Sequence, residues 1–451
     1  MLQKNPGELI EKPAVAALLV PRPVLEICTR LRDAGFEAFA VGGAVRDMLL
    51  NRGAADWDIA TSATVDQVES LFPDSRKFTA NYRTITLIFE GSGFEITPFR
   101  GSQLSIESDL TLRDFTIDAI ALEPEKGTLL DPGSGIRDLK KRIIRCVGDP
   151  LARFHEDPLR LLRAVRISAQ LRFRIEDATR EALSQCAPLL ARAAPERIRD
   201  ELSKILMTQE PVKALRLLLK TGLLSIILPE MMEGYRRRQS PPHRHTILEH
   251  ALLTVGHTPS VLHLRIAALL HDVAKPGLRT RSDRKYHFYG HEKRGAEIAA
   301  LILDRLRFGN VMRELVTNLI TNHMIVYDSG WSDGAVRRLI ARAGKDGIKD
   351  LLALKRADMM AQDGEENRDN TDELQRRIDS ILSKAKTSGL EPLRVSGRDV
   401  MEALGIGPGP KVGAAMAFLK EKVLDDPFVN SRDSLMEILL GMKNSRTYKR
   451  I

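Results

Sequence analysis

The stretch "VGGAVRDMLLNRGAADWDIATS" (residues 41–62) brings glycines and aspartates together between apolar runs. If its second half is a strand, Asp56 and Asp58 lie on one face, because alternate side chains of a strand point the same way. Paired carboxylates bind divalent cations such as Mg²⁺. Two such cations can activate a 3′-hydroxyl and stabilise the charge on a departing pyrophosphate. The spacing therefore indicates a metal site for nucleotidyl transfer, although a solvated acidic loop would show the same pair.

A candidate phosphate-binding turn precedes this pair. Gly42 and Gly43 come just before a predicted helix, so backbone N–H groups and the helix N-terminus can approach a triphosphate. Arg46, one turn into that helix, can act as a cationic clamp. A tight turn alone would explain the glycines. The turn and the acidic pair in this order favour a nucleoside triphosphate as the ligand.

Histidines form the second constellation, because nine of the ten lie within residues 243–323. His271 and Asp272 end the apolar helix "RIAALLHD", His250 lies in "TILEHALL", and Asp358 lies in "LLALKRADMM". Imidazoles combined with carboxylates suit a divalent transition metal, namely Mn, Fe, Ni, Co or Zn. Such a centre can generate a hydroxide that attacks a phosphoester.

Length and composition set the frame for both sites. With 451 residues, 43% of them hydrophobic, the chain can bury real cores and should divide into roughly two to four domains. A net charge of +9 and a pI near 9.4 favour a polyanionic partner. Cys28, Cys146 and Cys186 are far apart and odd in number, which indicates a reducing compartment and a cytoplasmic protein. No segment reaches the ~18 apolar residues of a membrane helix, so we expect no membrane partner.

The elements around the first site alternate between strands and helices. After a helix near residues 23–34, "EAFAVGG" predicts a strand, "AVRDMLLNRG" a helix and "ADWDIATS" another strand. "RTITLIFE" and "FEITPFR", separated by "GSG", predict a hairpin. From residue 149 onward helical periodicity dominates. We therefore expect an α+β fold, in which a head of β-sheet and helices is followed by all-α regions.

The motifs "GGAVRD", "DWDIA", "FEITPFR", "LRDFTIDA", "DPGSGIRDL" and "RFHEDPLRLLRAVRISAQLRF" follow one another in this order. The series resembles class II tRNA nucleotidyltransferases and bacterial poly(A) polymerases, from about residue 36 to residue 228. The resemblance implies that Asp56 and Asp58 bind Mg²⁺ and that Glu95 adds a third catalytic carboxylate. It also implies contacts to the triphosphate and ribose from Arg46, Arg113 and Asp114.

The same resemblance assigns base recognition to "EDPLRLLRAVR". Asp157 and Arg160 are three apart on one helical face, where Asp can accept from an exocyclic amine while Arg donates to a ring acceptor. Cytosine and adenine offer that pairing, and guanine and uracil offer the reverse. By resemblance these residues read the base of CTP or ATP in place of a template, with Arg163 and Arg166 further along the same basic face. Without the upstream motifs, a surface salt bridge would be the better explanation of the pair.

The histidine cluster resembles HD phosphohydrolases, whose ligands follow in the order H, HD and D. His291 in "YGHEKRG" and His323 in "LITNHMI" match the additional histidines of fuller HD sites and imply a second metal ion. Several bacterial tRNA nucleotidyltransferases carry such a domain after the neck and body. We predict an N-terminal extension (1–22), a nucleotidyltransferase head (23–147), a helical neck and body (148–234), an HD domain (235–365) and a basic helical tail (366–451).

Two features depart from the family pattern. The motif close to "RRDFTINA" here reads "TLRDFTIDA", so Leu112 replaces an arginine and Asp118 replaces an asparagine, which should weaken phosphate and ribose contacts. Between Arg100 and Asp109 lie only "GSQLSIES", where the family commonly carries a longer flexible loop associated with the change from C to A addition. We therefore expect CC addition to the 3′ end of tRNA, with the terminal A left to a partner enzyme.

Other functions stay open at this point. Head and neck motifs barely separate a CC-adding enzyme from a full CCA-adding enzyme or a poly(A) polymerase. A weakened head that serves mainly to bind RNA for an active HD phosphohydrolase is a further alternative. A non-catalytic RNA-binding protein ranks last, because both metal-ligand sets are intact. The turn "GIGPGPKVG" can contact a phosphate at a helix start, as in the tails of tRNA nucleotidyltransferases.

Overall fold

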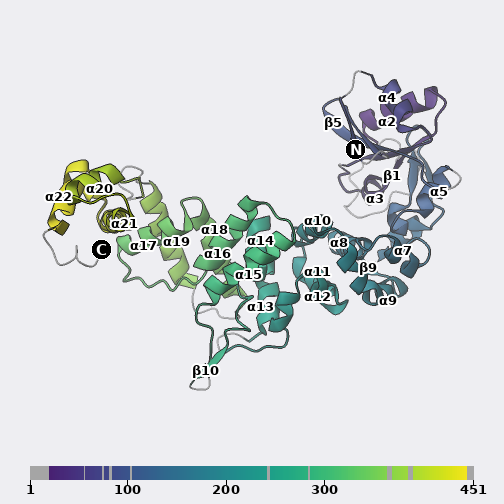
Figure 1. Ribbon diagram of the computed structural model, residues 1–451. Helices are drawn as coiled ribbons and strands as arrows, with labels where there is room; N and C mark the ends of the chain where they lie inside the picture. The colour runs from purple at the N-terminus through teal and green to yellow at the C-terminus, as the bar shows by residue number, and fades with distance from the viewer. Residues whose placement is uncertain are drawn as a thin grey trace. The chain divides into compact units, whose positions relative to one another are not determined.

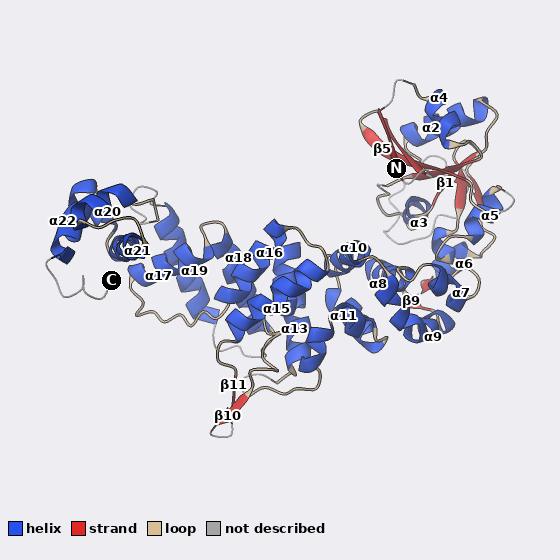
Figure 2. Ribbon diagram, in the orientation of Figure 1, coloured by secondary structure: helices blue, strands red, loops and turns tan. Residues whose placement is uncertain are grey.

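The computed structural model describes residues 20–54, 56–73, 76–80, 84–101, 104–240, 244–282, 285–362, 368–383 and 390–443. The predicted N-terminal extension therefore lies almost entirely outside the described residues. The chain divides into two compact units, Met1–Ile227 and Leu228–Ile451. A large sheet lies in the first unit (Figure 1), and the second is helical apart from one short hairpin (Figure 2). The predicted α+β class is confirmed.

A seven-stranded sheet forms the centre of the head, in the order β3-β4-β5-β2-β1-β6-β7. Its strands are β1 (Ala38–Val41), β2 (Asp58–Thr61), β3 (Arg76–Ala80), β4 (Thr84–Phe89), β5 (Ser92–Pro98), β6 (Ala121–Glu123) and β7 (Thr128–Leu130). Neighbouring strands are antiparallel except β2 and β5, which run parallel. Ile59, Ile85 and Ile96 are fully buried. The sheet is therefore a packed platform for the polar residues that its strands carry.

The register of the sheet places two acidic residues side by side. Asp58 is the first residue of β2, and its partner on β5 is Glu95. The predicted hairpin is present as β4 and β5, joined at Glu90 and Gly91, which both have positive φ as a type I′ turn requires. Asp56 precedes β2 instead of lying within it. The prediction that one strand carries both aspartates is therefore wrong for Asp56.

Helices complete the head. They are α2 (Arg22–Asp33), α3 (Gly43–Leu49), α4 (Val65–Leu71), α5 (Ile106–Thr111), α6 (Gly135–Lys141) and the 3₁₀ turn η1 (Thr116–Asp118). α2 buries Val24, Ile27 and Leu31 completely, a spacing of three and four residues that forms one apolar stripe. α4 begins with a capping box between Thr64 and Gln67. These local signals agree with the helix positions that the sequence predicts.

The first unit continues as a set of short helices. They are α7 (Pro150–Glu156), α8 (Arg160–Leu171), α9 (Asp177–Cys186), η2 (Ala187–Arg192), α10 (Pro195–Leu206), α11 (Pro211–Lys220) and α12 (Leu223–Ile227), with the two-residue strands β8 (Ile143–Ile144) and β9 (Arg174–Ile175). Proline opens α7, α10 and α11, where its missing N–H costs no hydrogen bond.

A break separates α7 from α8, and it corrects one prediction. Asp157 has extended backbone angles (φ −142°, ψ 100°) and ends α7, whereas Arg160 begins α8. The two residues therefore do not share one helical face. The physical reason is Pro158, because proline disfavours the helical conformation for the residue before it.

The second unit has two helical parts and a small hairpin. The first part contains η3 (Pro229–Gly234), α13 (Ile247–His257), α14 (Leu262–Leu270), β10 (Thr280–Ser282), β11 (Lys285–His287), α15 (His291–Arg305), α16 (Asn310–Asn322), α17 (Asp333–Ala343), α18 (Gly347–Met360) and α19 (Arg368–Ser383). The C-terminal part contains α20 (Gly397–Leu404), α21 (Pro410–Asp425), η4 (Pro427–Val429) and α22 (Arg432–Lys443). It has a hydrophobic core of its own, which includes Val400, Leu419 and Leu435.

Two observations bear on the expectations drawn from composition. Cys28, Cys146 and Cys186 are all buried and unpaired, so they form no disulfide. Among the described residues, no helix combines the length and the apolar character needed to cross a bilayer.

Candidate functional site

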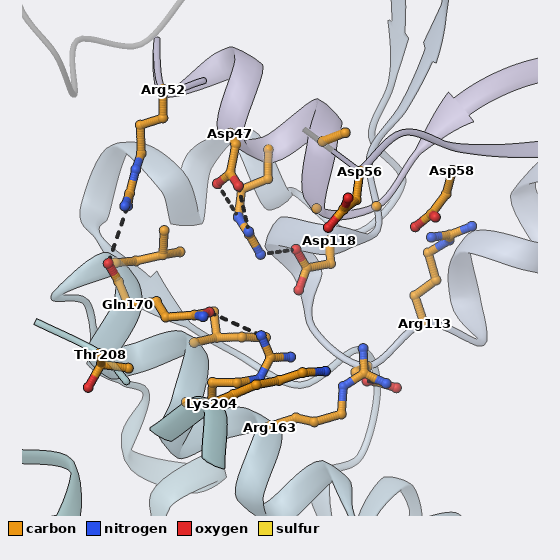
Figure 3. A pocket seen from close by; sticks show the side chains of 18 of the residues that line it. Asp47, Arg52, Asp56, Asp58, Arg113, Asp118, Arg163, Gln170, Lys204 and Thr208 are labelled. Carbon is orange, nitrogen blue, oxygen red and sulfur yellow. Dashed lines mark hydrogen bonds and ion pairs between the residues drawn. The ribbon is translucent and has the colours of Figure 1, made fainter. Parts of the chain in front are cut away.

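A polar pocket of about 800 Å³ lies within the first unit, lined by the head and by helices α8 and α10 (Figure 3). Its lining includes nine of the predicted site residues: Gly42, Gly43, Arg46, Asp56, Asp58, Arg113, Asp114, Arg163 and Arg166. Glu95, Asp157 and Arg160 do not line it. Figure 3 shows Asp56, Asp58 and Asp118 on one side of the pocket, with Arg163 and Lys204 reaching toward it from the other.

The acidic side of the pocket is electrostatically crowded. Asp58 is mostly buried, and its strand partner Glu95 stands next to it on β5. Burial and the negative charge of Glu95 raise the pKa of Asp58 to about 6. Clustered carboxylates of this kind repel one another, and a divalent cation relieves that repulsion. The donor set of Asp56 and Asp58, with Glu95 beside them, therefore fits a hard cation such as Mg²⁺.

Gly42 is the glycine that this geometry requires. Its φ of 77° lies in the left-handed region, which residues with a side chain rarely adopt. A Cβ at this position would lie 3.1 Å from both an Asp58 carboxylate oxygen and an Arg113 nitrogen. Glycine therefore lets the chain pass directly beside the acidic pair before Gly43 begins α3.

The cations predicted to hold the triphosphate already have acidic partners. Arg46 donates to Asp118 at 2.6 Å and to Asp47 at 2.9 Å. Arg113 contacts Asp109 at 3.0 Å. Asp118, which stands where the family pattern has an asparagine, is therefore the residue that engages the predicted clamp. A triphosphate must compete with these carboxylates for the same guanidinium groups.

The arginines of the neck are paired in the same way. Asp114 accepts from Arg160 at 2.7 Å and lies 2.8 Å from Arg163, so it ties α8 to the head. Arg166 donates to Glu201 of α10 at 2.7 Å. The basic face predicted along this helix therefore consists of arginines that also join three elements of the first unit.

Asp157 pairs with a residue other than Arg160. Its carboxylate accepts from Arg197 of α10 at 2.8 Å, and it caps the backbone N–H of Leu159. Partial burial would raise the pKa of Asp157, but these hydrogen bonds outweigh it and lower the pKa. Asp157 is therefore a charged acceptor, while Arg160 hydrogen-bonds Glu156 and Asp114.

Several of the residues that line the pocket escaped sequence reasoning. Arg52, Gln170, Lys204 and Thr208 all line the cavity (Figure 3), and Arg52 donates to the backbone carbonyl of Gln170 at 3.3 Å. Lys204 had a weak signal, since it lies on the polar side of the amphipathic run "PERIRDELSKILM". The other three lie in segments whose proximity depends on how the helices fold against the head.

The short connection after β5 is pinned in place. Buried Asp109, the fourth residue of α5, accepts from Arg100 at 2.7 Å and pairs with Arg113. Ser105 caps α5, so only four residues separate Arg100 from this cap, and residues 102–103 lie outside the description. A Cβ on Gly101, whose φ is 103°, would lie 2.0 Å from the Ser108 hydroxyl. The described part of the connection therefore packs tightly against α5.

The six predicted metal ligands of the second unit come together in a buried cluster. Asp272 lies at its centre. Its Oδ2 is 3.2 Å from His271 Nε2 and 3.7 Å from His250 Nε2. Its Oδ1 is 3.5 Å from His291 Nε2 and 3.8 Å from His323 Nε2. Asp358 is 3.0 Å from His250. Two sets can hold an ion, His250 with His271 and Asp272, and Asp272 with His291 and His323.

Backbone carbonyls fix the orientation of three of these rings. The Nδ1 atoms of His271, His291 and His323 lie 2.7–2.8 Å from the carbonyl oxygens three residues earlier. A carbonyl only accepts, so Nδ1 carries the hydrogen and Nε2 keeps its lone pair toward the cluster. Among the described residues, Asp272 Oδ1 accepts no hydrogen bond, whereas Oδ2 is paired with Lys275 at 2.7 Å. This donor set fits one or two transition-metal ions.

Electrostatics favour the ligating form of His323 and Asp272, whereas the negative charge of Asp272 outweighs burial and raises the pKa of His271. Burial and the neighbouring His271 lower the pKa of His323 to about 3, so its imidazole is neutral at pH 7. Burial would raise the pKa of Asp272, but His271 and Lys275 hold it well below its usual range. Lys275, whose Nζ lies 2.7 Å from Asp272, is a residue that sequence reasoning missed. Its spacing of three from Asp272, in the turns that follow α14, was the available signal.

The head sheet, its acidic pair and the facing arginines are the parts of a nucleotidyltransferase. Comparisons with family models agree with this class. The head domain of poly(A) polymerases matches residues 38–145, the probable RNA- and SrmB-binding site of polymerase A matches residues 172–234, and the HD domain matches residues 246–374. The three matches follow the same order as the sites described above.

Relatives extend the match along the chain. An A-adding tRNA nucleotidyltransferase of Deinococcus radiodurans is 33% identical over 417 residues, which cover 85% of this chain and 91% of the relative. The chain belongs to the tRNA nucleotidyltransferase family. A CCA-adding enzyme of Leuconostoc mesenteroides is 42% identical over 215 residues, 45% of this chain, so the chain spans about half (53%) of that relative. The crystal structure of the Bacillus stearothermophilus CCA-adding enzyme in complex with CTP has a TM-score of 0.71 at 27% identity, covering 98% of this chain and 100% of the other.

Proposed function

We propose that this chain extends the 3′ end of tRNA with cytidines without a template, adds two of them, and leaves the terminal A to a partner enzyme. The observation that carries the specificity is the short connection between Arg100 and Asp109. Its ends are clamped by the Arg100–Asp109–Arg113 ion pairs, and Gly101 packs against α5. A segment held in this way has little length with which to rearrange the pocket between two bases.

The head pocket supports the transfer chemistry. Mg²⁺ bound by Asp56 and Asp58, with Glu95 beside them, would activate the RNA 3′-hydroxyl and neutralise charge on the leaving group. The hydroxyl oxygen bonds to the α-phosphorus and loses its proton, the bond from that phosphorus to the bridging oxygen breaks, and pyrophosphate leaves with the electron pair. Arg46 and Arg113 bind the triphosphate. Arg163, on the neck helix α8, also binds the nucleotide.

Base selection falls to the break between α7 and α8. Asp157 is a charged acceptor and Arg160 a donor, and both lie beside the Asp114 contact that joins α8 to the head. Acceptor and donor together suit cytosine and adenine. For these groups to reach a base, Asp157 must share or release Arg197. The relatives named above include both A-adding and CCA-adding enzymes, so the nucleotide must be tested directly.

The test is incorporation of labelled CTP and ATP, separately and together, into tRNAs that end before CCA, after C and after CC. We expect two cytidines and no adenosine, and Asp58→Ala should incorporate neither. Addition of full CCA to the first tRNA would show that the short connection does not restrict the enzyme to cytidines. It would still agree with membership of the tRNA nucleotidyltransferase family. Long adenylate tails with ATP alone would identify a poly(A) polymerase.

A second activity is favoured by the histidine cluster. We propose that it holds one or two transition-metal ions and hydrolyses a phosphoester at an RNA end: water adds to phosphorus, and the leaving oxygen takes the electron pair of the broken P–O bond. The two buried ligand sets that share Asp272, whose Oδ1 accepts no hydrogen bond from a described residue, carry this proposal. Release of a terminal phosphate, or opening of a 2′,3′-cyclic phosphate to a phosphomonoester, should require Mn²⁺, Ni²⁺ or Co²⁺ and be lost in His271→Ala. Activity that survives this substitution would contradict it.

A further inference from the structure

Cations and aromatic rings crowd the segment between α14 and α15. Residues 275–290 read "KPGLRTRSDRKYHFYG", with five Lys or Arg against one acid and two of the six tyrosines of the chain. β10 and β11 pair here as an antiparallel hairpin, which projects from the helices around it (Figure 1). Residues 283–284, in its turn, lie outside the description. The segment is therefore a compact basic surface with aromatic side chains interleaved.

Its rings are arranged for stacking. The Arg279 guanidinium lies 3.6 Å from the centre of the Tyr286 ring. His287 and Tyr289 are parallel to within 3°, with their centres 5.5 Å apart. Tyr289 is nevertheless 78% exposed. One side of this ring is covered by an imidazole, and the ring is open enough to receive a further planar group.

The cations of the hairpin are available for a ligand. Arg281 and Lys285 are exposed, and neither forms an ion pair with any residue in the described part of the chain. Arg281 lies 5.8 Å from the centre of the Tyr286 ring. In the head, by contrast, Arg46, Arg113 and Arg163 all have carboxylate partners. A polyanion would therefore meet fewer competing acids at the hairpin than in the head pocket.

Direct contacts connect this segment to the metal cluster. The carbonyl of Phe288 accepts from His291 Nδ1 at 2.7 Å, which orients that candidate ligand. Lys275 contacts Asp272 at 2.7 Å and lies 5.5 Å from the centre of the Phe288 ring. On its other side the hairpin is anchored by the Tyr286 N–H, which donates to the Ser240 hydroxyl at 2.5 Å. The aromatic surface therefore has a fixed position at the edge of the cluster.

We propose that residues 279–282 and 285–289 bind the last nucleotides of a single-stranded RNA and present its terminal phosphate to the Asp272 cluster. The proposal rests on the hydrolase function proposed above and names its substrate class. Tyr289 stacks on a base, and Arg281 and Lys285 contact phosphates, the combination by which proteins bind single strands without reading sequence. The preferred substrate is then an oligonucleotide and not a small phosphodiester.

The test compares two substrates of the full-length, Mn²⁺-loaded protein, a hexaribonucleotide with a 2′,3′-cyclic phosphate and bis(p-nitrophenyl) phosphate. Tyr289→Ala should raise KM for the hexamer about tenfold, the usual worth of one stacked base. It should leave kcat and hydrolysis of the small diester unchanged. Arg281→Ala should reduce the slope of log affinity against log salt by about 0.7, the value for one phosphate contact on a single strand.

Two matched variants separate stacking from other causes. Tyr289→Phe keeps the ring and should behave as wild type, and Tyr235→Ala removes an exposed tyrosine outside the hairpin and should change nothing. An unchanged KM for the hexamer in Tyr289→Ala, or equal losses on both substrates, would overturn the proposal.

If the wild type hydrolyses neither substrate, the hydrolase function fails and the binding surface is judged separately. A hexamer with 4-thiouridine at its 3′ end is then photocrosslinked to the protein. Crosslinks within residues 285–289 that disappear in Tyr289→Ala support binding without hydrolysis. Crosslinks that fall only outside this segment overturn it.

Discussion

Arg46 faces two carboxylates in the head pocket, and the closer one, Asp118 at 2.6 Å, replaces the asparagine of the family pattern. A triphosphate must displace this carboxylate or share the guanidinium with it. Asp118→Asn removes the competing charge and keeps a side chain of the same shape. We expect the KM for CTP to fall about fivefold, because a hydrogen bond to a charged group is worth about 1 kcal/mol more than one to a neutral group.

Steady-state kinetics on a tRNA lacking CCA would measure this change. Asp47→Asn is the matched control, since Asp47 also contacts Arg46 but is half-exposed beside it. A higher KM in Asp118→Asn would show that Asp118 orients Arg46 for the nucleotide and does not compete with it.

Asp58 gives the head a pH dependence whose sign can be worked out. Burial and Glu95 raise its pKa to about 6, above the unfolded value of 3.8. The folded protein therefore binds the extra proton between these values, and the stability from protonated Asp58 is lost as the pH rises through 6. In EDTA, Asp58→Asn should be more stable than wild type above pH 6 and equally stable near pH 4. Thermal melts from pH 4 to 8 would show this difference in melting temperature. Adding Mg²⁺ should stabilise the wild type and so remove the advantage of Asp58→Asn.

At the scale of secondary-structure elements, some parts of the site could be predicted from the sequence and others could not. Periodicity and turn residues located α2, α3, the β4–β5 hairpin and the Gly42 turn, because these depend on neighbours in the sequence, whereas β3, β6 and β7 were not predicted. Pro158 carried the signal for the break before α8, but the i,i+3 spacing of Asp157 and Arg160 was taken as evidence of one helix. The pairing of Arg46 with Asp118 was out of reach, since the two residues are 72 positions apart and only the fold of the head brings them together.

The ion pairs of Asp109 with Arg100 and Arg113, which hold the short connection after β5, also act between elements. Asp109 is 1% exposed and holds both Arg100 and Arg113. Removing one partner of such a buried pair costs about 3 kcal/mol. Asp109→Ala should therefore lower the free energy of unfolding of the head by about that amount in urea. Glu107→Ala, an exposed residue on the same helix, should stay within about 0.5 kcal/mol of wild type.

At the scale of the whole molecule, the proposed Mg²⁺ ligands of the head and the proposed metal cluster around Asp272 belong to two separate units. The division predicts that each chemistry can be removed without the other. Asp58→Ala should abolish nucleotide addition and spare phosphoester hydrolysis, and Asp272→Ala should do the reverse. Loss of both activities in either variant would show that the two units depend on each other.

The number of metal ions per chain should depend on which ligand of the cluster is removed, because Asp272 is shared by two ligand sets. Both ligand sets use this residue, whereas His323 belongs to one of them. Elemental analysis should find two transition-metal ions per chain in wild type, one in His323→Ala and none in Asp272→Ala. Equal content in wild type and His323→Ala would mean that the cluster holds a single ion.

The three cysteines all belong to the first unit, and residues 228–451 contain none. Each thiol is at most 3% exposed, and burial raises the pKa of Cys28 and Cys146 to about 12. The native protein should therefore resist alkylation until the head or neck opens. The rate of thiol labelling therefore reports how fast the first unit opens. A single cysteine introduced in the second unit can be labelled with a fluorophore while the three native thiols stay unreacted.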